Sequence, residues 1–152
     1  MRYTTLASSE HSHLYITRGT FFHLENEPFV PISPLESARA ALDWPLAFYR
    51  GDNGLQLVAV LSLDDTDNYA VGPKGLWMGG YMPAIVRAHP LSMSVRDGKA
   101  AVLVDTQSDW LSTDKGNPMF DSEGNPNQVV NRRIGLLKNQ GPNPRWDNPA
   151  LE

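Results

Sequence analysis

Four histidines are the side chains of this sequence best suited to metal or acid–base chemistry, and His11 and His13 lie one residue apart. On a β-strand, positions i and i+2 project from one face, where two imidazoles can share a metal ion. A complete site needs a third ligand, for which folding would have to bring in His23 or His89. The pair therefore supports a metal-dependent enzyme as one hypothesis. The alternative is a pair of surface or hydrogen-bonded histidines.

Acidic turns are a second candidate for ion binding. The run at 64–68, Asp-Asp-Thr-Asp-Asn, resembles the start of a calcium loop. An EF-hand loop beginning at Asp65 would require glycine at its sixth position and glutamate at its twelfth, where this chain has Ala70 and Leu76. The template fails, which favours a solvated turn. The same interpretation applies to the acidic residues of later turns, Asp114, Asp121 and Glu123.

Four aromatic residues, Trp44, Trp77, Tyr81 and Trp110, could stack against sugar rings. In a domain of this size, tryptophans also commonly belong to the core or its edge, so both interpretations stay open. The sequence has no nucleophile-elbow, Walker, dinucleotide-binding or zinc-protease motif. We predict no cofactor and lean against an enzyme.

Composition excludes several classes of protein. There are no cysteines, which rules out disulfides, cysteine-ligated metals and cysteine nucleophiles. Thirteen lysines and arginines against seventeen acidic residues give a formal charge of -4, so nucleic acid is not expected as a partner. No apolar run approaches the roughly 20 residues of a membrane span, and no membrane insertion is expected. The N-terminus lacks the apolar stretch of a secretory signal, which makes the cytoplasm the default expectation.

The first half of the chain predicts short strands, one helix and a hairpin. Strand-like composition occurs at 14–17, 20–24 and 29–32. A capping box, with Ser33 before Pro34 and Glu36 at N3, predicts a helix from Ser33 to Asp43. The helix should bury a stripe of apolar side chains at helical spacing, namely Leu35, Ala38 and Leu42, with Ala41 as a further candidate. Asn53-Gly54 predicts a hairpin between 46–50 and a central strand at 55–63.

The second half predicts two more hairpins and two helices. The hairpins join 69–71 to 75–78 and 91–95 to 100–104. The helices cover 83–89, where His89 meets the last carbonyls before Pro90, and 127–138. Together these elements predict an α+β fold, a mainly antiparallel β-sheet built from hairpins with two or three short helices. We expect a single domain at 1–138.

A proline-rich tail follows at 139–152. Its prolines prevent a helix and remove backbone donors. Trp146, between Arg145 and Asp147, is its best anchor, because a large ring supplies most of the burial that a short segment can offer. Trp146 is therefore a candidate partner-binding residue. Folding back on the same domain is the alternative.

Five segments, in order, resemble the bacterial SapC family. They are SEHSHLYI at 9–16; FVPI at 29–32 with WPLAF at 44–48; LVAVLSL at 57–63; GLWMGGYMPAIVRAHPL at 75–91; and GNPMFDSEG at 116–124. The fourth segment contains Trp77, Tyr81 and Arg87, which are candidates for binding a ligand or partner. Their alternative role is structural, in a strand feeding a proline-started helix whose Arg87 makes a fixed pair. The resemblance supplies no catalytic residue.

The resemblance implies a surface-layer context and a chain that ends where relatives continue. A non-catalytic structural or assembly protein is the first hypothesis, acting as a homo-oligomer or in a larger assembly through its C-terminal tail. Such an assembly could be a surface layer or virus particle, which would place the protein at the cell surface or in a virion. Similar proteins are often encoded near outer-membrane receptors and halogenase-like enzymes. The second hypothesis is a small-molecule or glycan-binding accessory protein that works beside an enzyme and uses Trp77, Tyr81 and Arg87.

Overall fold

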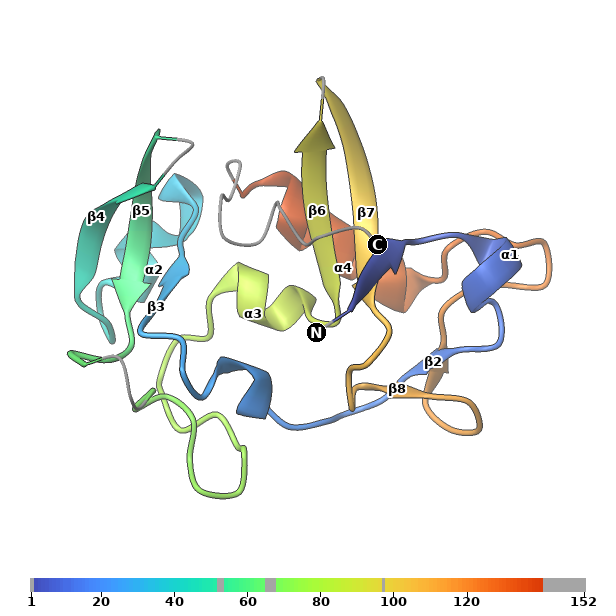
Figure 1. Ribbon diagram of the computed structural model, residues 1–152, viewed down its shortest axis with the longest axis horizontal. Coiled ribbons are helices and arrows are strands. Elements are labelled where there is room, and N and C mark those ends of the chain that lie inside the picture. The colour runs from blue at the N-terminus through green and yellow to red at the C-terminus, as the bar shows by residue number, and fades with distance from the viewer. Residues whose placement is uncertain (1, 52–53, 65–67, 97, 141–152) are drawn as a thin grey trace.

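The protein has a mixed α+β fold in which strands outnumber helices (Figure 1). We describe a computed structural model, which defines every residue except 1, 52–53, 65–67, 97 and 141–152. The predicted fold class is confirmed. Its strands form three small antiparallel sheets instead of one, and the described residues contain four α-helices instead of two or three.

One sheet has the order β3-β5-β4, with β3 at Phe29–Pro31, β4 at Leu46–Gly51 and β5 at Gly54–Val60. The predicted β4–β5 hairpin is confirmed, and Gly51 pairs with Gly54 at its end. Strand β5 is central, as expected, but it is buried only toward its carboxyl end, at Val58 and Ala59. Strand β4 forms one edge of this sheet and lies at the outside of the molecule (Figure 1).

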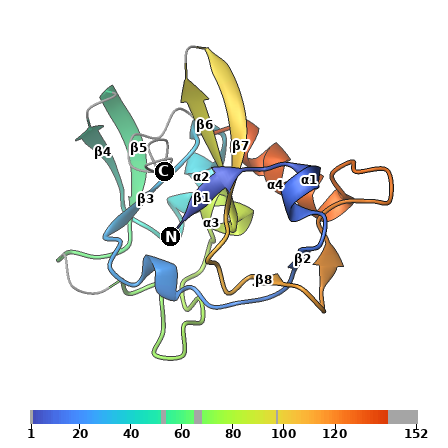
Figure 2. The same cartoon turned by 45° about the vertical axis from the view of Figure 1, so that its right-hand side comes forward.

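A second sheet has the order β1-β7-β6, and a third has the order β8-β2-β9. The second combines the predicted hairpin of β6 and β7 with the N-terminal strand β1. Its bounds are β1 Tyr3–Thr5, β6 Leu91–Arg96 and β7 Lys99–Asp105, and those of the third sheet are β2 Tyr15–Ile16, β8 Leu111–Ser112 and β9 Asn117–Pro118. In both ribbon views, the β4–β5 and β6–β7 hairpins rise as separate arms from the same side of the molecule (Figure 2).

The α-helices and short 3-10 helices connect and cover these sheets. They are α1 Ser8–His11, η1 Phe22–Leu24, η2 Pro34–Glu36, α2 Ser37–Ala40, α3 Ala84–Ala88 and α4 Gln128–Lys138. Helices α3 and α4 match the predicted segments. Both belong to the hydrophobic core, to which α3 contributes Ile85 and Val86, and α4 contributes Val130 and Leu137. No helix among the described residues is long and apolar enough to cross a membrane.

Two predicted β segments are wrong or reduced. The segment 20–24 contains the 3-10 helix η1 and no strand, and its apolar residues Phe21 and Leu24 are buried three positions apart, the period of a 3-10 helix. The expected hairpin of 69–71 and 75–78 consists of one isolated bridge between Val71 and Trp77. The glycine-rich and proline-containing stretch between these residues provides too few paired positions for a ladder.

The predicted buried stripe of the helix after Ser33 is also wrong. Leu35 and Leu42 are 82% and 77% exposed, whereas Ala40 is fully buried. The capping box at Ser33 is present, but it starts a 3-10 turn that continues into one short α turn ending at Ala40. A 3-10 turn rotates by a third of a circle per residue, so the side chains after it no longer follow the α-helical spacing from which the stripe was predicted.

Candidate functional site

The carboxylate of Glu36 is the centre of a polar cluster that connects three parts of the described chain. Its Oε1 atom accepts hydrogen bonds from the Ser33 backbone N–H at 3.0 Å and from the Gln140 side-chain amide at 2.9 Å. Its Oε2 atom accepts from the Tyr81 hydroxyl at 2.7 Å and from the Ala84 backbone N–H at 2.8 Å. One side chain thus joins the start of η2, the start of α3 and the residues after α4.

Tyr81 and Arg87, two of the predicted binding residues, meet in this cluster. Arg87 donates from Nη2 to the Tyr81 hydroxyl oxygen at 3.2 Å, and its guanidinium carbon lies 5.7 Å from the ring centroid. Burial and the hydrogen bond to Glu36 raise the pKa of the Tyr81 hydroxyl. The phenol therefore stays protonated and donates a hydrogen bond to Glu36. The fixed partner that the sequence analysis expected for Arg87 is therefore the Tyr81 hydroxyl group.

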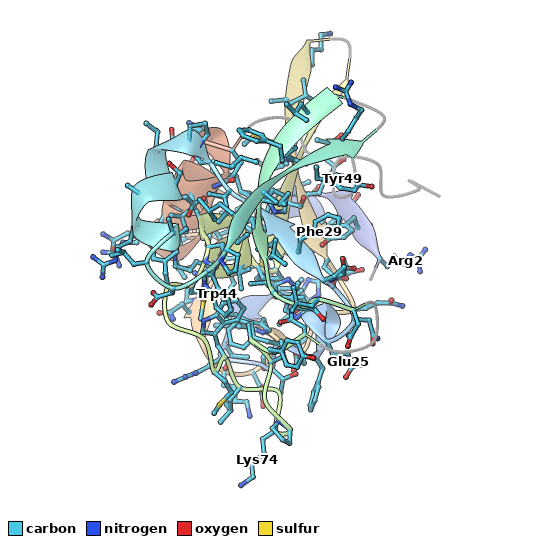
Figure 3. The ribbon with its side chains drawn as sticks, turned by 90° about the vertical axis from the view of Figure 1, so that its left-hand side faces the viewer. Arg2, Glu25, Phe29, Trp44, Tyr49 and Lys74 are labelled. Carbon is cyan, nitrogen blue, oxygen red and sulfur yellow. The ribbon has the colours of Figure 1, made fainter. Side chains whose placement is uncertain are left out.

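Trp77, the third predicted binding residue, is one ring removed from this cluster. Its ring centroid lies 5.9 Å from that of Trp44 and 5.7 Å from that of Phe21, both in edge-to-face arrangements. Trp44, labelled in Figure 3, then donates from Nε1 to the Tyr81 carbonyl oxygen at 2.6 Å. The Trp77 indole nitrogen is buried and has no hydrogen-bond partner in the described chain. These aromatic rings pack against one another at the edge of the core.

A pair of stacked histidines forms a second cluster that sequence reasoning did not identify. The rings of His23 and His89 lie 3.8 Å apart at an interplanar angle of 13°. Trp110 approaches His89 edge-on at 5.6 Å. Residues at 23 and 89 carry no spacing signal for this contact, because η1 and the end of α3 are brought together only by the packing of the core. Both histidines also line a small pocket with Tyr3 and Ile85.

His89 has the geometry of a general base beside a hydroxyl but not the basicity. Its Nε2 atom lies 2.6 Å from Ser108 Oγ, within the range of a nucleophile–base pair. Burial, together with the charges of His23 and Arg133, lowers the His89 pKa to about 2. Burial also lowers the pKa of His23, against the opposing effects of Asp109 and Asp105. Since effective general bases have a pKa near the working pH, the cluster is suited to packing and not to proton abstraction.

The expected strand placement of His11 and His13 is wrong. His11 ends the short helix α1 and is buried, with Nε2 at 3.2 Å from Thr4 Oγ1 and Nδ1 at 2.9 Å from the Ala7 carbonyl oxygen. His13 follows in a turn and is exposed. Local hydrogen bonding by His11 stabilises a helical turn in place of a strand. The described residues contain no group of three or more histidines and carboxylates arranged to hold a metal ion.

The acidic turns make local hydrogen bonds. Asp121 accepts from the backbone N–H groups of Asn125 at 2.8 Å and Glu123 at 2.9 Å, and these bonds lower its pKa. Asp114 accepts from the Ser112 hydroxyl at 2.6 Å. The calcium-like run lies partly outside the described residues, at 65–67. In the described turns, the carboxylates accept hydrogen bonds from groups of the same turn, as expected for solvated turns.

Comparison with known proteins adds one decisive finding. The sequence profile of the SapC family matches residues 6–143. The chain belongs to the SapC family. No curated protein and no solved structure matches it.

The SapC match covers both polar clusters. It includes Glu36, Tyr81 and Arg87 as well as the stacked histidines at 23 and 89. Trp146, the predicted anchor of the tail, lies beyond the matched residues and outside the described residues. Among the described candidates, the structure brings Tyr81 and Arg87 together. It connects Trp77 to them through Trp44 and places neither His11 nor His13 beside them.

Proposed function

We propose that this SapC-family chain is a non-catalytic structural or assembly protein, which makes subunit contacts through its exposed β surface and its C-terminal segment. One observation carries the proposal. The β4–β5 hairpin presents apolar side chains to solvent, with Phe48 71% and Leu55 60% exposed. The strand register puts both side chains on one face of the hairpin, and apolar side chains exposed together in this way are characteristic of a contact with another macromolecule.

The aromatic character of the hairpin extends to its other face. Tyr49 is exposed and lies 4.6 Å from Phe29, ring centroid to ring centroid, and Figure 3 shows the two side by side on the sheet. Aromatic side chains are enriched at protein interfaces because they bury a large area with few rotatable bonds. Both faces of this arm therefore offer contact area to a neighbouring subunit.

The polar clusters support a structural role over a catalytic one. The four hydrogen bonds accepted by Glu36 come from the protein itself, and the buried imidazole of His89 is too weakly basic to take a proton at neutral pH. A saturated carboxylate and a neutral buried histidine both stabilise the fold. In this proposal, the assembly is a surface layer, a virus particle or another large array of subunits.

Size-exclusion chromatography with light scattering tests the proposal on the full chain and on a chain lacking residues 141–152. This deletion keeps Gln140 and its bond to Glu36. We expect the full chain to form concentration-dependent oligomers and the shortened chain to form smaller ones. A full chain that stays strictly monomeric at high concentration, with no change on deletion, would contradict the assembly role. It would favour the alternative of a small-molecule or glycan-binding accessory protein.

A further inference from the structure

Along β4, the backbone N–H and C=O groups of successive residues point alternately toward β5 and toward the outer edge of the sheet. The Val60 N–H donates to the Pro45 carbonyl oxygen at 2.9 Å, which places that pair at a hydrogen-bonded position of the antiparallel ladder. Hydrogen-bonded positions alternate along such a ladder, so Ala47, Tyr49 and Gly51 direct their backbone groups toward β5. The backbone N–H and C=O groups of the intervening residues, Leu46, Phe48 and Arg50, then point away from the sheet.

Strand β4 lacks the features that usually prevent edge-to-edge pairing. Within the described part of the sheet it pairs with β5 alone (Figure 1). It contains no proline and no lysine, and Arg50 is its single charged residue. Protein edges are ordinarily protected by prolines, charges, bulges or very short strands, whereas this edge is regular, six residues long and largely apolar.

We infer that β4 of one chain pairs antiparallel with β4 of a second copy, with Phe48 opposite Phe48 across a two-fold axis perpendicular to the sheet. The two three-stranded sheets become one continuous six-stranded sheet. This inference rests on the proposed assembly role and identifies the surface and partner for one of its contacts. An isologous contact of this kind forms a closed pair of chains.

The register follows from the faces of the strand and from its hydrogen bonds. Phe48 is opposite Leu57 on the face that contains the buried Ala59, and a perpendicular two-fold axis keeps that face on the same side in both copies. Only registers that place like faces together are then allowed. With Phe48 on the axis, the outward residues face one another and exchange about six backbone hydrogen bonds, whereas centring on Tyr49 allows about four.

Charge also favours this register. Arg50 of each copy lies opposite Leu46 of the other, so the two guanidinium groups are about four residues, or roughly 13 Å, apart along the strands. Like charges directly opposite each other would destabilise the pairing. The two phenylalanines at the centre instead form a cross-strand aromatic pair, which stabilises antiparallel ladders.

A second copy fits this edge better than the chain's own tail. Pro142, Pro144 and Pro149 have no backbone N–H, so the tail cannot supply a continuous row of donors. The second copy supplies a strand of the same length with the complementary alternation. Because one strand pair is an interface at the small end of the usual range, the dimer should depend on protein concentration.

Single-cysteine variants test the register directly, because the natural chain has no cysteine. In Phe48→Cys, two identical residues face each other at a Cα separation of about 5.5 Å, which suits a disulfide. In Arg50→Cys, the matched control on the same face of the same strand, the cysteines are roughly 13 Å apart and cannot bridge. Under mild oxidation, we expect Phe48→Cys to form covalent dimers at least about tenfold faster. Equal rates for the two variants would overturn the register.

Light scattering of full-length charge variants separates this contact from the wider proposal. Phe48→Lys places two ammonium groups on the axis and should shift the wild-type dimer to monomer. Val95→Lys, an exposed residue on the other hairpin, should leave the dimer intact. If wild type oligomerises but Phe48→Lys does not change its mass, the β4 contact is wrong and the assembly role survives. If wild type is monomeric at high concentration, both fail.

Discussion

The Tyr81 hydroxyl donates to the Glu36 carboxylate at 2.7 Å, although the two residues are 45 positions apart. The same carboxylate closes the capping box of η2 and accepts the first free N–H of α3. A residue that the sequence identified as a helix cap is therefore also a tertiary connection. This dual use explains why Tyr81 and Arg87 lie together without needing a ligand to hold them.

Replacing Tyr81 with phenylalanine should lower the free energy of unfolding by about 1–2 kcal/mol, since it removes a hydrogen bond to a charged acceptor while keeping the ring. Glu36 would retain its bonds from the backbone of Ser33 and Ala84. Urea unfolding followed by tryptophan fluorescence measures the change. Tyr69→Phe is the matched control, because Tyr69 is exposed and should tolerate the change within about 0.5 kcal/mol. Equal effects in the two variants would show that the Glu36 bond contributes nothing.

Stability should fall as the pH is lowered from 7 to 5. The His89 pKa in the folded protein is about 2, while that of an unfolded histidine is about 6.5. Below pH 6.5 the unfolded chain therefore binds a proton that the folded chain does not, and the stability present above that pH is progressively lost. One such histidine costs about 2 kcal/mol over this interval, and the lowered pKa of His23 acts in the same direction.

Urea unfolding at pH 7, 6 and 5 measures this dependence on the wild type and on two variants. His13→Ala removes an exposed histidine and is the control for the loss of a histidine as such. His23→Phe keeps a ring against His89 but removes one titrating group, so its slope should be shallower. A wild-type stability that is constant from pH 7 to 5 would contradict the buried neutral state of His89.

Local signals predicted much of the fold. The capping box at Ser33, the hairpin through Gly54 and the helix at 127–138 all depend on contacts within a few residues, and all are present. The failures have a different cause. The His23–His89 stack joins residues from distant elements, and no spacing in the chain encodes their approach. At Leu35, a 3-10 turn changed the angular position of the side chains after a correctly predicted start.

The sequence analysis named Tyr81 and Arg87, which lie in the Glu36 cluster, but it did not predict their contacts with each other or with Glu36. Tyr81 and Arg87 were selected by resemblance, and the structure places them in contact. Glu36 was predicted only as a cap, because sequence spacing reveals its bond to the Ser33 backbone but not its bond to Tyr81. For His11 the local prediction itself was wrong. Its spacing from His13 suited one face of a strand, but His11 lies at the end of the short helix α1. Tertiary contacts decided the outcome at Glu36, whereas a local contact with the Ala7 carbonyl oxygen accounts for His11.

Replacing Gly79 with alanine should destabilise the fold by about 1–3 kcal/mol, because a Cβ atom at this position would overlap the Trp44 ring. Displacing that ring also disrupts the Trp44 Nε1 bond to the Tyr81 carbonyl oxygen and the contact with Trp77. Urea unfolding and near-ultraviolet circular dichroism measure the loss of stability and of the fixed tryptophan environment. Full stability with an unchanged spectrum would contradict the close approach of Gly79 and Trp44.

Replacing Gly135 with alanine should instead raise the free energy of unfolding by about 0.5–1 kcal/mol. Gly135 lies inside α4, and a Cβ atom there would meet nothing within 4 Å, so alanine gains helix propensity without a clash. Gly116→Ala is the opposed control, because Gly116 has a φ of 112° and its Cβ atom would lie 2.5 Å from the Ile16 carbonyl oxygen. Thermal unfolding should therefore shift upward for the first variant and downward for the second. A downward shift for Gly135→Ala would mean that α4 has a neighbour on this exposed side in solution, and the subunit contacts proposed above would then extend to that helix.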